Sequence, residues 1–179
     1  MFHFRSKMYS ATGFNSQMQN VFAENTMAVK NYIQYSILSD PLEQVYADKL
    51  IKNQTAIGEL VGFFDFQKTV IVQKFTQFMQ YIFSMIPVLK YKINVKVYRE
   101  KWYEQADEIC KIVHSMNTWD IREFLYKQIQ SIELIINSFL KKDAMAQQHH
   151  YNYLLENNKK FALILTQGII TDNKERFVQ

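Results

Sequence analysis

Apolar side chains recur at every third or fourth position along most of this chain, which is the spacing that places them on one face of an α-helix. Short polar segments interrupt this repeat and separate one helix from the next. The first expected helix runs from about Ser16 to Ser39, and the others begin near Asp40, Asp65, Asn94, Thr118 and Asp143. Because short turns between long helices favour antiparallel neighbours, the sequence predicts an all-α, up-and-down antiparallel helical bundle of about six helices.

Short motifs support individual helix boundaries. Asp40-Pro41-Leu42-Glu43 combines an N-capping aspartate, a proline at the first helical position and a glutamate three residues after the cap. Lys141-Lys142-Asp143 places cations at the end of one helix and an acid at the start of the next, as the helix dipole favours. Pro87 should kink or shorten the third helix near its end. Gly58, inside the second helix, costs about 1 kcal/mol relative to alanine and therefore indicates close packing against a neighbour.

The composition agrees with a helical fold and a single domain. The chain has 179 residues with only 4 glycines and 2 prolines, so it lacks the turn residues that a strand-rich fold requires. A chain of this length normally forms one domain. We expect residues 16–179 to form a single helical-bundle domain and residues 1–15, which include the loose stretch Ser10–Gly13, to form an N-terminal extension.

Charge and cysteine content narrow the range of functions. The net charge is +4, but the densest basic cluster, between Lys90 and Lys101, is offset by Glu100 and Glu104. A nucleic-acid footprint should be a basic stripe with little acid in it, so we expect no nucleic-acid binding. Cys110 is the one cysteine, so an internal disulfide is excluded. It lies in an apolar run, which indicates an inert buried thiol.

The distribution of apolar residues bears on membrane insertion and on localisation. The most apolar region, Thr69–Leu89, is interrupted by Gln73, Lys74 and Gln77, so we expect no membrane span. The first residues lack the continuous apolar stretch of a signal peptide. The resulting expectation is an intracellular or virion-enclosed protein that is not secreted through a signal peptide.

Residues that could perform chemistry are few. His149 and His150 are adjacent and point in different directions on a helix, and the nearest acid on their C-terminal side, Glu156, is too far along the chain to share their face. The sequence also lacks a Glu-x-x-His pair, a nucleophile elbow and a glycine-rich phosphate loop. We therefore expect no enzymatic activity, no metal and no cofactor.

Polar residues that interrupt the apolar stripes are a subtler feature. Gln128 occupies a core-facing position of the fifth helix and Asn25 one of the first, while Gln80 and Asn152 lie on the flanks of their helices. A buried amide without a hydrogen-bond partner costs about 1–3 kcal/mol. A shared network is one interpretation, in which neighbours such as Asn25 satisfy Gln128. The alternative is that some of these amides face a helix boundary and meet water.

Several motifs, in order, resemble those of an uncharacterised family of bacterial helical-bundle proteins with relatives in large DNA viruses. The family pattern W-E-x-H-x-x-W-T-R-N-x-I is similar to Phe22–Ile33, its N-Q-x-x-I-G is intact at Asn53–Gly58, and its N-A-D-E-I region resembles Trp102–Ile109. Its L-Y-x-H-L resembles Leu125–Ile129, and its G-I-I ending resembles the stretch from Gly168 to Phe177. The resemblance covers about residues 20–177 and implies the same bundle.

The departures from the family pattern concern its inward-facing histidines and acids, a set that would suit a metal or a polar ligand in the bundle core. The positions that match them here carry Asn25, Gln80, Gln128, Asn152 and Asn157, with Leu163 in place of a further acid, and Glu24 alone is retained. Neutral amides are poor ligands for transition metals and cannot act as general bases near neutral pH. The resemblance therefore implies a degenerate core polar site, and it brings no reaction with it because no activity is attached to the family.

Together these observations favour a non-catalytic helical bundle that acts as a structural or protein-interaction component. A protein partner or self-association is expected, and a virion-associated role follows if the source is a large virus. The alternative is a bundle that binds a small molecule or a metal at the degenerate core site.

Overall fold

The computed structural model describes residues 9–114 and 121–178, and helices make up 87% of them. Six α-helices pack against one another in this part of the chain, which confirms the all-α bundle. The helices are α1 (Ala11–Leu38), α2 (Leu42–Val61), α3 (Lys68–Tyr91), α4 (Val95–His114), α5 (Arg122–Leu140) and α6 (Ala144–Asp172). A single 3-10 turn (Lys174–Arg176) follows α6, and two short strands, β1 (Tyr9–Ser10) and β2 (Phe177–Val178), lie near the ends of the chain.

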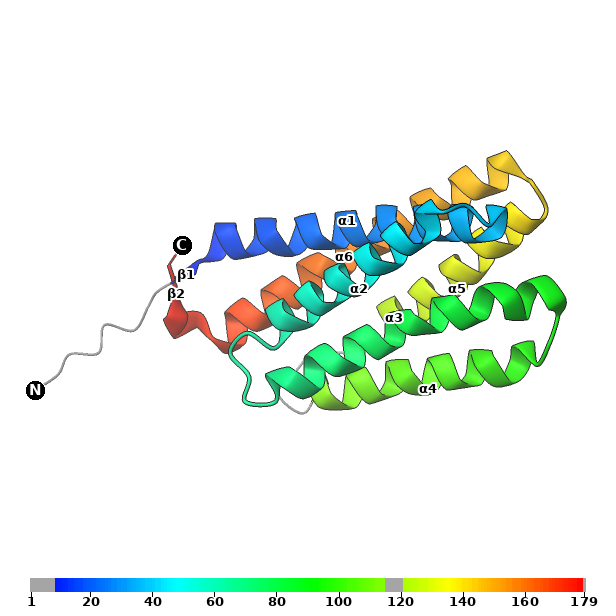
Figure 1. Cartoon of the computed structure of the whole chain (residues 1–179). Coiled ribbons are helices and arrows are strands. Elements are labelled where there is room, and N and C mark those ends of the chain that lie inside the picture. The colour runs from blue at the N-terminus through cyan, green and yellow to red at the C-terminus, as the bar shows by residue number, and fades with distance from the viewer. Residues whose placement is uncertain (1–8, 115–120, 179) are drawn as a thin grey trace, which may run out of the picture.

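The helices run up and down, so that the bundle has two distinct ends (Figure 1). β1, β2 and the connection between α2 and α3 lie at one end, which we name the terminal end. The α1–α2, α3–α4 and α5–α6 connections lie at the other, which we name the turn end. α1 packs mainly against α2 and α6, and α3 packs against α2 and α4.

The N-terminal boundary differs from the expectation. α1 begins at Ala11 instead of near Ser16, because the hydroxyl of Ser10 caps the helix by accepting a hydrogen bond from the backbone N–H of Gly13 at 3.0 Å. The stretch expected to be loose is thus the first turn of a helix. β1 immediately before it pairs in parallel with β2, with Tyr9 opposite Phe177. Residues 1–8 of the expected extension lie outside the described residues.

Two of the expected capping acids lie at helix starts. The carboxylate of Asp40 accepts the backbone N–H of Leu42 at 2.8 Å, and α2 begins at that residue, with Pro41, the expected first helical residue, at the N-cap position. Asp143 is the N-cap of α6 and accepts the backbone N–H of Ala146 at 3.0 Å. Both acids satisfy amide groups that the helix itself leaves unpaired.

The remaining boundaries are shifted by a few residues. Asp65 accepts the N–H of Gln67 at 2.6 Å in the turn that precedes α3, and α4 begins directly after Asn94. Pro87 lies inside α3, which ends at Tyr91. Thr118, where the fifth helix was expected to open, lies outside the described residues, and α5 is described from Arg122.

Gly58 shows how closely α2 and α3 approach. A Cβ at this position would lie 2.6 Å from the backbone Cα of Val72 in α3. No side chain fits at that distance without moving backbone, which confirms the close packing expected from the glycine. The two helices therefore form a tightly held pair in the body of the bundle.

The hydrophobic core runs along the bundle and receives side chains from all six helices. Its largest fully buried members are Trp102, Phe22, Phe75, Phe78 and Phe161. Burying a large apolar side chain stabilises the fold by about 1.5–3 kcal/mol. No helix within residues 9–114 and 121–178 combines the length and apolarity needed to cross a bilayer.

Candidate functional site

A chain of buried hydrogen bonds links three helices in the interior. The amide nitrogen of Gln128 in α5 donates to the side-chain oxygen of Asn158 in α6 at 2.6 Å. The amide nitrogen of Asn158 donates to the hydroxyl of Thr26 in α1 at 2.8 Å, and that hydroxyl donates to the carbonyl of Phe22 at 2.7 Å. All three polar side chains are buried. Each amide thus finds a protein partner, and the chain fixes α5 and α6 against α1.

The partner of Gln128 is a correction to the sequence-based interpretation. Asn25, the neighbour expected to satisfy it, is buried, but its side-chain oxygen has no hydrogen-bond partner among the described residues. Consecutive helical residues point about 100° apart, so Thr26 and Asn25 cannot both face the same neighbour. Thr26 is the residue of α1 that joins the buried chain.

The structure does not bring the six candidate core residues together. Gln128, Asn25 and Asn157 are buried, and Asn157 donates to the carbonyl of Phe124 at 3.0 Å without joining the chain. The other three, Glu24, Gln80 and Asn152, are exposed. Asn152 accepts a hydrogen bond from its own helix, and Gln80 lines a shallow hollow on the surface of α3 and α4. The exposed three lie on the outer sides of their helices and cannot contribute to a core site.

The sequence does not predict two polar contacts between α4 and α5, an ion pair and a tyrosine–aspartate hydrogen bond. Arg99 binds the carboxylate of Glu133 through Nε at 2.9 and 3.0 Å, and Glu133 is largely buried. The hydrogen bond to Glu133 raises the pKa of the Arg99 guanidinium. Tyr126 donates to Asp107 at 2.9 Å, and burial, followed by the hydrogen bond to Asp107, raises the pKa of its phenol. The one available signal was an acid within the apolar face of α5, at Glu133.

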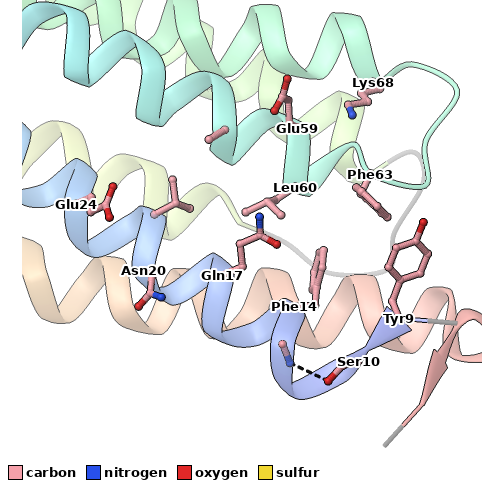
Figure 2. Close-up of a pocket in the computed structure, with 13 residues that line it drawn as sticks. Tyr9, Ser10, Phe14, Gln17, Asn20, Glu24, Glu59, Leu60, Phe63 and Lys68 are labelled. Atoms are coloured by element: carbon pink, nitrogen blue, oxygen red, sulfur yellow. Dashed lines mark hydrogen bonds between the residues drawn. The ribbon is translucent and has the colours of Figure 1, made fainter.

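A groove of about 660 Å³ lies near the terminal end, between α1 and α2 (Figure 2). One wall is a face of α1, where residues at helical spacing point to the same side. The other wall comes from α2 and from the start of α3. The lining residues are Tyr9, Ser10, Gly13, Phe14, Gln17, Asn20, Val21, Glu24, Ala56, Glu59, Leu60, Phe63 and Lys68.

The groove has an apolar part and a polar part. Tyr9, Phe14 and Phe63 lie at one end of it, where the Tyr9 and Phe63 ring centroids are 5.0 Å apart and meet edge to face. Glu24 on α1 and Glu59 on α2 contribute a carboxylate to each wall (Figure 2). Both acids are exposed, and neither takes part in the ion pairs of the described residues.

Lys68 is the cation of the groove. Its ammonium lies 5.8 Å from the centroid of the Phe63 ring, close to the aromatic part. The hydroxyl of Ser10 is already engaged as the cap of α1. Among the described residues that line the groove there is no histidine or cysteine, and the side chains present are apolar, acidic, amide and hydroxyl groups together with the Lys68 ammonium.

Two sets of observations bear on metal and on kinship. Within residues 9–114 and 121–178, no group of three or more His, Cys, Asp and Glu side chains is arranged to hold a metal ion. His149 and His150 are adjacent in the sequence, and their rings meet edge to face with centroids 5.4 Å apart. No family model matches the chain, and no curated protein or solved structure matches it significantly.

Proposed function

We propose that this chain is a non-catalytic protein-interaction component and that it holds a basic, partly apolar segment of a partner protein in the groove between α1 and α2. The observation that carries the proposal is the pairing of an aromatic end with two carboxylates that no cation of the described residues engages. A partner segment with one large apolar side chain and one or two cations would satisfy both parts.

The chemistry of the groove supports binding in preference to catalysis. A hydroxyl nucleophile needs a general base within hydrogen-bond reach to activate it. The hydroxyl of Ser10, the one aliphatic hydroxyl among the described residues that line the groove, instead caps α1. A structural or virion-associated component would need only the recognition that this surface provides.

The alternative, a ligand or metal site in the core, has no specific observation in its favour. Gln128 belongs to the predicted degenerate site, and its amide donates to Asn158, which in turn donates to Thr26. These side chains bind one another and do not converge on a space where a ligand would bind. We therefore place the function at the groove.

The test uses two synthetic amphipathic helical peptides, one built from leucine and lysine and the other from leucine and glutamate. Each is fluorescently labelled, and its binding to the whole chain is followed by fluorescence anisotropy. We expect the leucine–lysine peptide to bind and the leucine–glutamate peptide not to bind. The double substitution Glu24→Gln/Glu59→Gln should weaken binding about tenfold, since each lost charge pair accounts for roughly 0.7 kcal/mol at a surface and about 1.4 kcal/mol is a factor of ten.

The matched control is Glu104→Gln/Asp172→Asn, which removes two exposed acids that do not line the groove. It should leave binding within about twofold of the unsubstituted chain. Equal binding of both peptides, or equal loss in the groove variant and the control, would exclude the groove as the interaction site.

A further inference from the structure

The turn end of the bundle presents a concentration of exposed apolar side chains. Seven large apolar residues in or beside its three turns are between 44% and 87% exposed: Leu38, Leu42, Val45, Tyr91, Ile93, Val97 and Met145. They come from segments far apart in the sequence, which Figure 1 shows gathered at the same end. Scattered exposed apolar residues are normal on a protein surface, but a cluster of this kind marks an interaction site.

Lysines are interleaved with these apolar side chains. The segments 38–45, 90–97 and 140–145 contain five lysines and three acids. The α3–α4 turn carries the sequence Lys90-Tyr91-Lys92-Ile93, in which every residue is exposed. Lys96 is the only one of the five lysines that appears in the ion pairs of the described residues, with Glu100 at 3.8 Å.

The three acids at this end take part in local hydrogen bonds. Asp40 accepts the backbone N–H of Leu42 at the start of α2, Asp143 caps α6, and Glu43 accepts a hydrogen bond from the phenol of Tyr32 at 3.4 Å. The five lysines outnumber the three acids of these segments, and four of the lysines have no carboxylate partner within the described residues.

We propose that the turn end docks on the surface of an anionic lipid bilayer. Exposed apolar side chains such as Tyr91, Ile93 and Met145 would enter the boundary between headgroups and acyl chains, as in interfacial membrane binding. The neighbouring lysines would lie at the level of the lipid phosphates, where the negative surface potential attracts them. Tyrosine suits this position because its ring is apolar and its hydroxyl is polar. Docking of this kind needs no helix that crosses the bilayer.

The charge pattern favours a bilayer over a second copy of the chain. A two-fold contact between copies would bring the same lysine-rich surface against itself, so like charges would face each other. A bilayer that contains anionic lipid offers opposite charge and an apolar layer at the same surface. A surface that recognised an acidic protein instead would give no flotation with anionic vesicles in the experiment below.

The test is co-flotation of the whole chain with vesicles of phosphatidylcholine alone and with vesicles that also contain phosphatidylserine. We expect flotation with the anionic vesicles only, and a decrease as sodium chloride screens the charges. Tyr91→Ser/Ile93→Ser and, separately, Lys92→Gln/Lys142→Gln should each reduce the bound fraction at least fivefold. Because all four residues are exposed, the variants should keep the circular dichroism spectrum and melting temperature of the parent chain.

Two controls lie at the terminal end. Phe66→Ser removes an apolar side chain that is 89% exposed, and Lys174→Gln removes an exposed cation. Both should float like the parent chain. A fluorescent Tyr91→Trp variant should be quenched by brominated lipid, whereas Phe66→Trp should not.

Three results would overturn the proposal: no flotation with anionic vesicles, equal flotation with neutral vesicles, or equal loss in the turn-end variants and the terminal-end controls. Concentration-dependent dimerisation that the turn-end substitutions abolish, without flotation, would assign this surface to contacts between copies.

Discussion

The two ends of the bundle use similar side chains in opposite ways. At the terminal end, the rings of Tyr9, Phe14, Phe63, Phe64 and Phe177 pack on one another, with centroids 4.9 to 6.4 Å apart. At the turn end, Tyr91, Ile93 and Met145 point outward without such partners and are 63%, 56% and 87% exposed. Apolar residues at the first end pack on one another and also line part of the groove, whereas these three at the second end make no such ring contacts among the described residues and are largely exposed.

The difference depends on the backbone beside each cluster. The pairing of β1 with β2 brings Tyr9 opposite Phe177, and the α2–α3 connection adds Phe63 and Phe64. The tight turns at the other end are too short to fold back over one another. Phe66 is the exception at the terminal end, since it lies beside the ring cluster and is almost fully exposed.

The largest expected effect contrasts one residue from each end. Phe177→Ala removes a buried ring and should lower the free energy of unfolding by about 3 kcal/mol, because it leaves a cavity among the packed rings. Ile93→Ala, at the turn end, should change it by less than about 0.5 kcal/mol. Urea denaturation followed by circular dichroism measures both, and equal effects would end the contrast between the two ends.

The second prediction concerns the closely packed helices that hold the two ends apart. Gly58→Ala places a Cβ against the backbone of Val72 and should destabilise the chain by about 2 kcal/mol through overpacking. Gly13→Ala is the matched control, since the nearest atoms to its Cβ lie at 3.4 Å in the side chain of Ser10. A melting temperature that Gly58→Ala leaves unchanged would show that α2 and α3 lie further apart than described.

The third prediction concerns the buried hydrogen bond between Gln128 and Asn158 and its contribution to the free energy of unfolding. Gln128→Leu leaves the oxygen of Asn158 without its donor and should cost about 1 kcal/mol. The double variant Gln128→Leu/Asn158→Leu should be about 1 kcal/mol more stable than the sum of the single effects. Gln128→Leu and Asn25→Leu should instead be additive within about 0.5 kcal/mol. Coupling to Asn25 and additivity with Asn158 would restore the sequence-based interpretation.

The smallest effect concerns pH and the buried layer beneath the turn end. Burial raises the pKa of Tyr32 from 10.0 to about 12, and the carboxylate of Glu43 adds to the increase. The unfolded chain ionises this phenol first, so its stabilising contribution is complete below pH 10 and is lost as the pH rises towards about 12. Absorbance titration should show that Tyr32 ionises late, as does Tyr126, and Tyr32→Phe should remove one of these late steps. If Tyr32→Phe leaves the high-pH absorbance change unaltered, the turn end is exposed more deeply than the structure indicates.

The sequence was sufficient for the fold because helices are encoded locally. The periodic apolar stripes, the capping acids Asp40 and Asp143 and the closely packed Gly58 each act within a few residues of their own position. Partners across the bundle depend on the rotation of each helix about its axis, which the stripes define only coarsely. Asn157 and Asn158 are adjacent, yet only Asn158 meets Gln128.

The groove and the contrast between the two ends could not be predicted from the sequence for a related reason. Phe63 and Phe177 gather around Tyr9 only once three distant segments are in place. The family resemblance predicts that Glu24 belongs to a core site, but its side chain lies on the wall of an external groove. Which side of α1 remains uncovered follows from the packing of α2 and α6, and no motif in α1 records it.

The most direct test of the contrast between the two ends is hydroxyl-radical footprinting of the free chain, read by mass spectrometry. Met145 at the turn end is 87% exposed, while Met18, in the half of α1 nearer the terminal end, is fully buried. Because both are methionines, their intrinsic reactivity is the same. We expect rapid oxidation of Met145 together with Tyr91 and protection of Met18 together with Phe177. Similar oxidation rates for the two methionines, or protection of Tyr91, would contradict the contrast between the two ends.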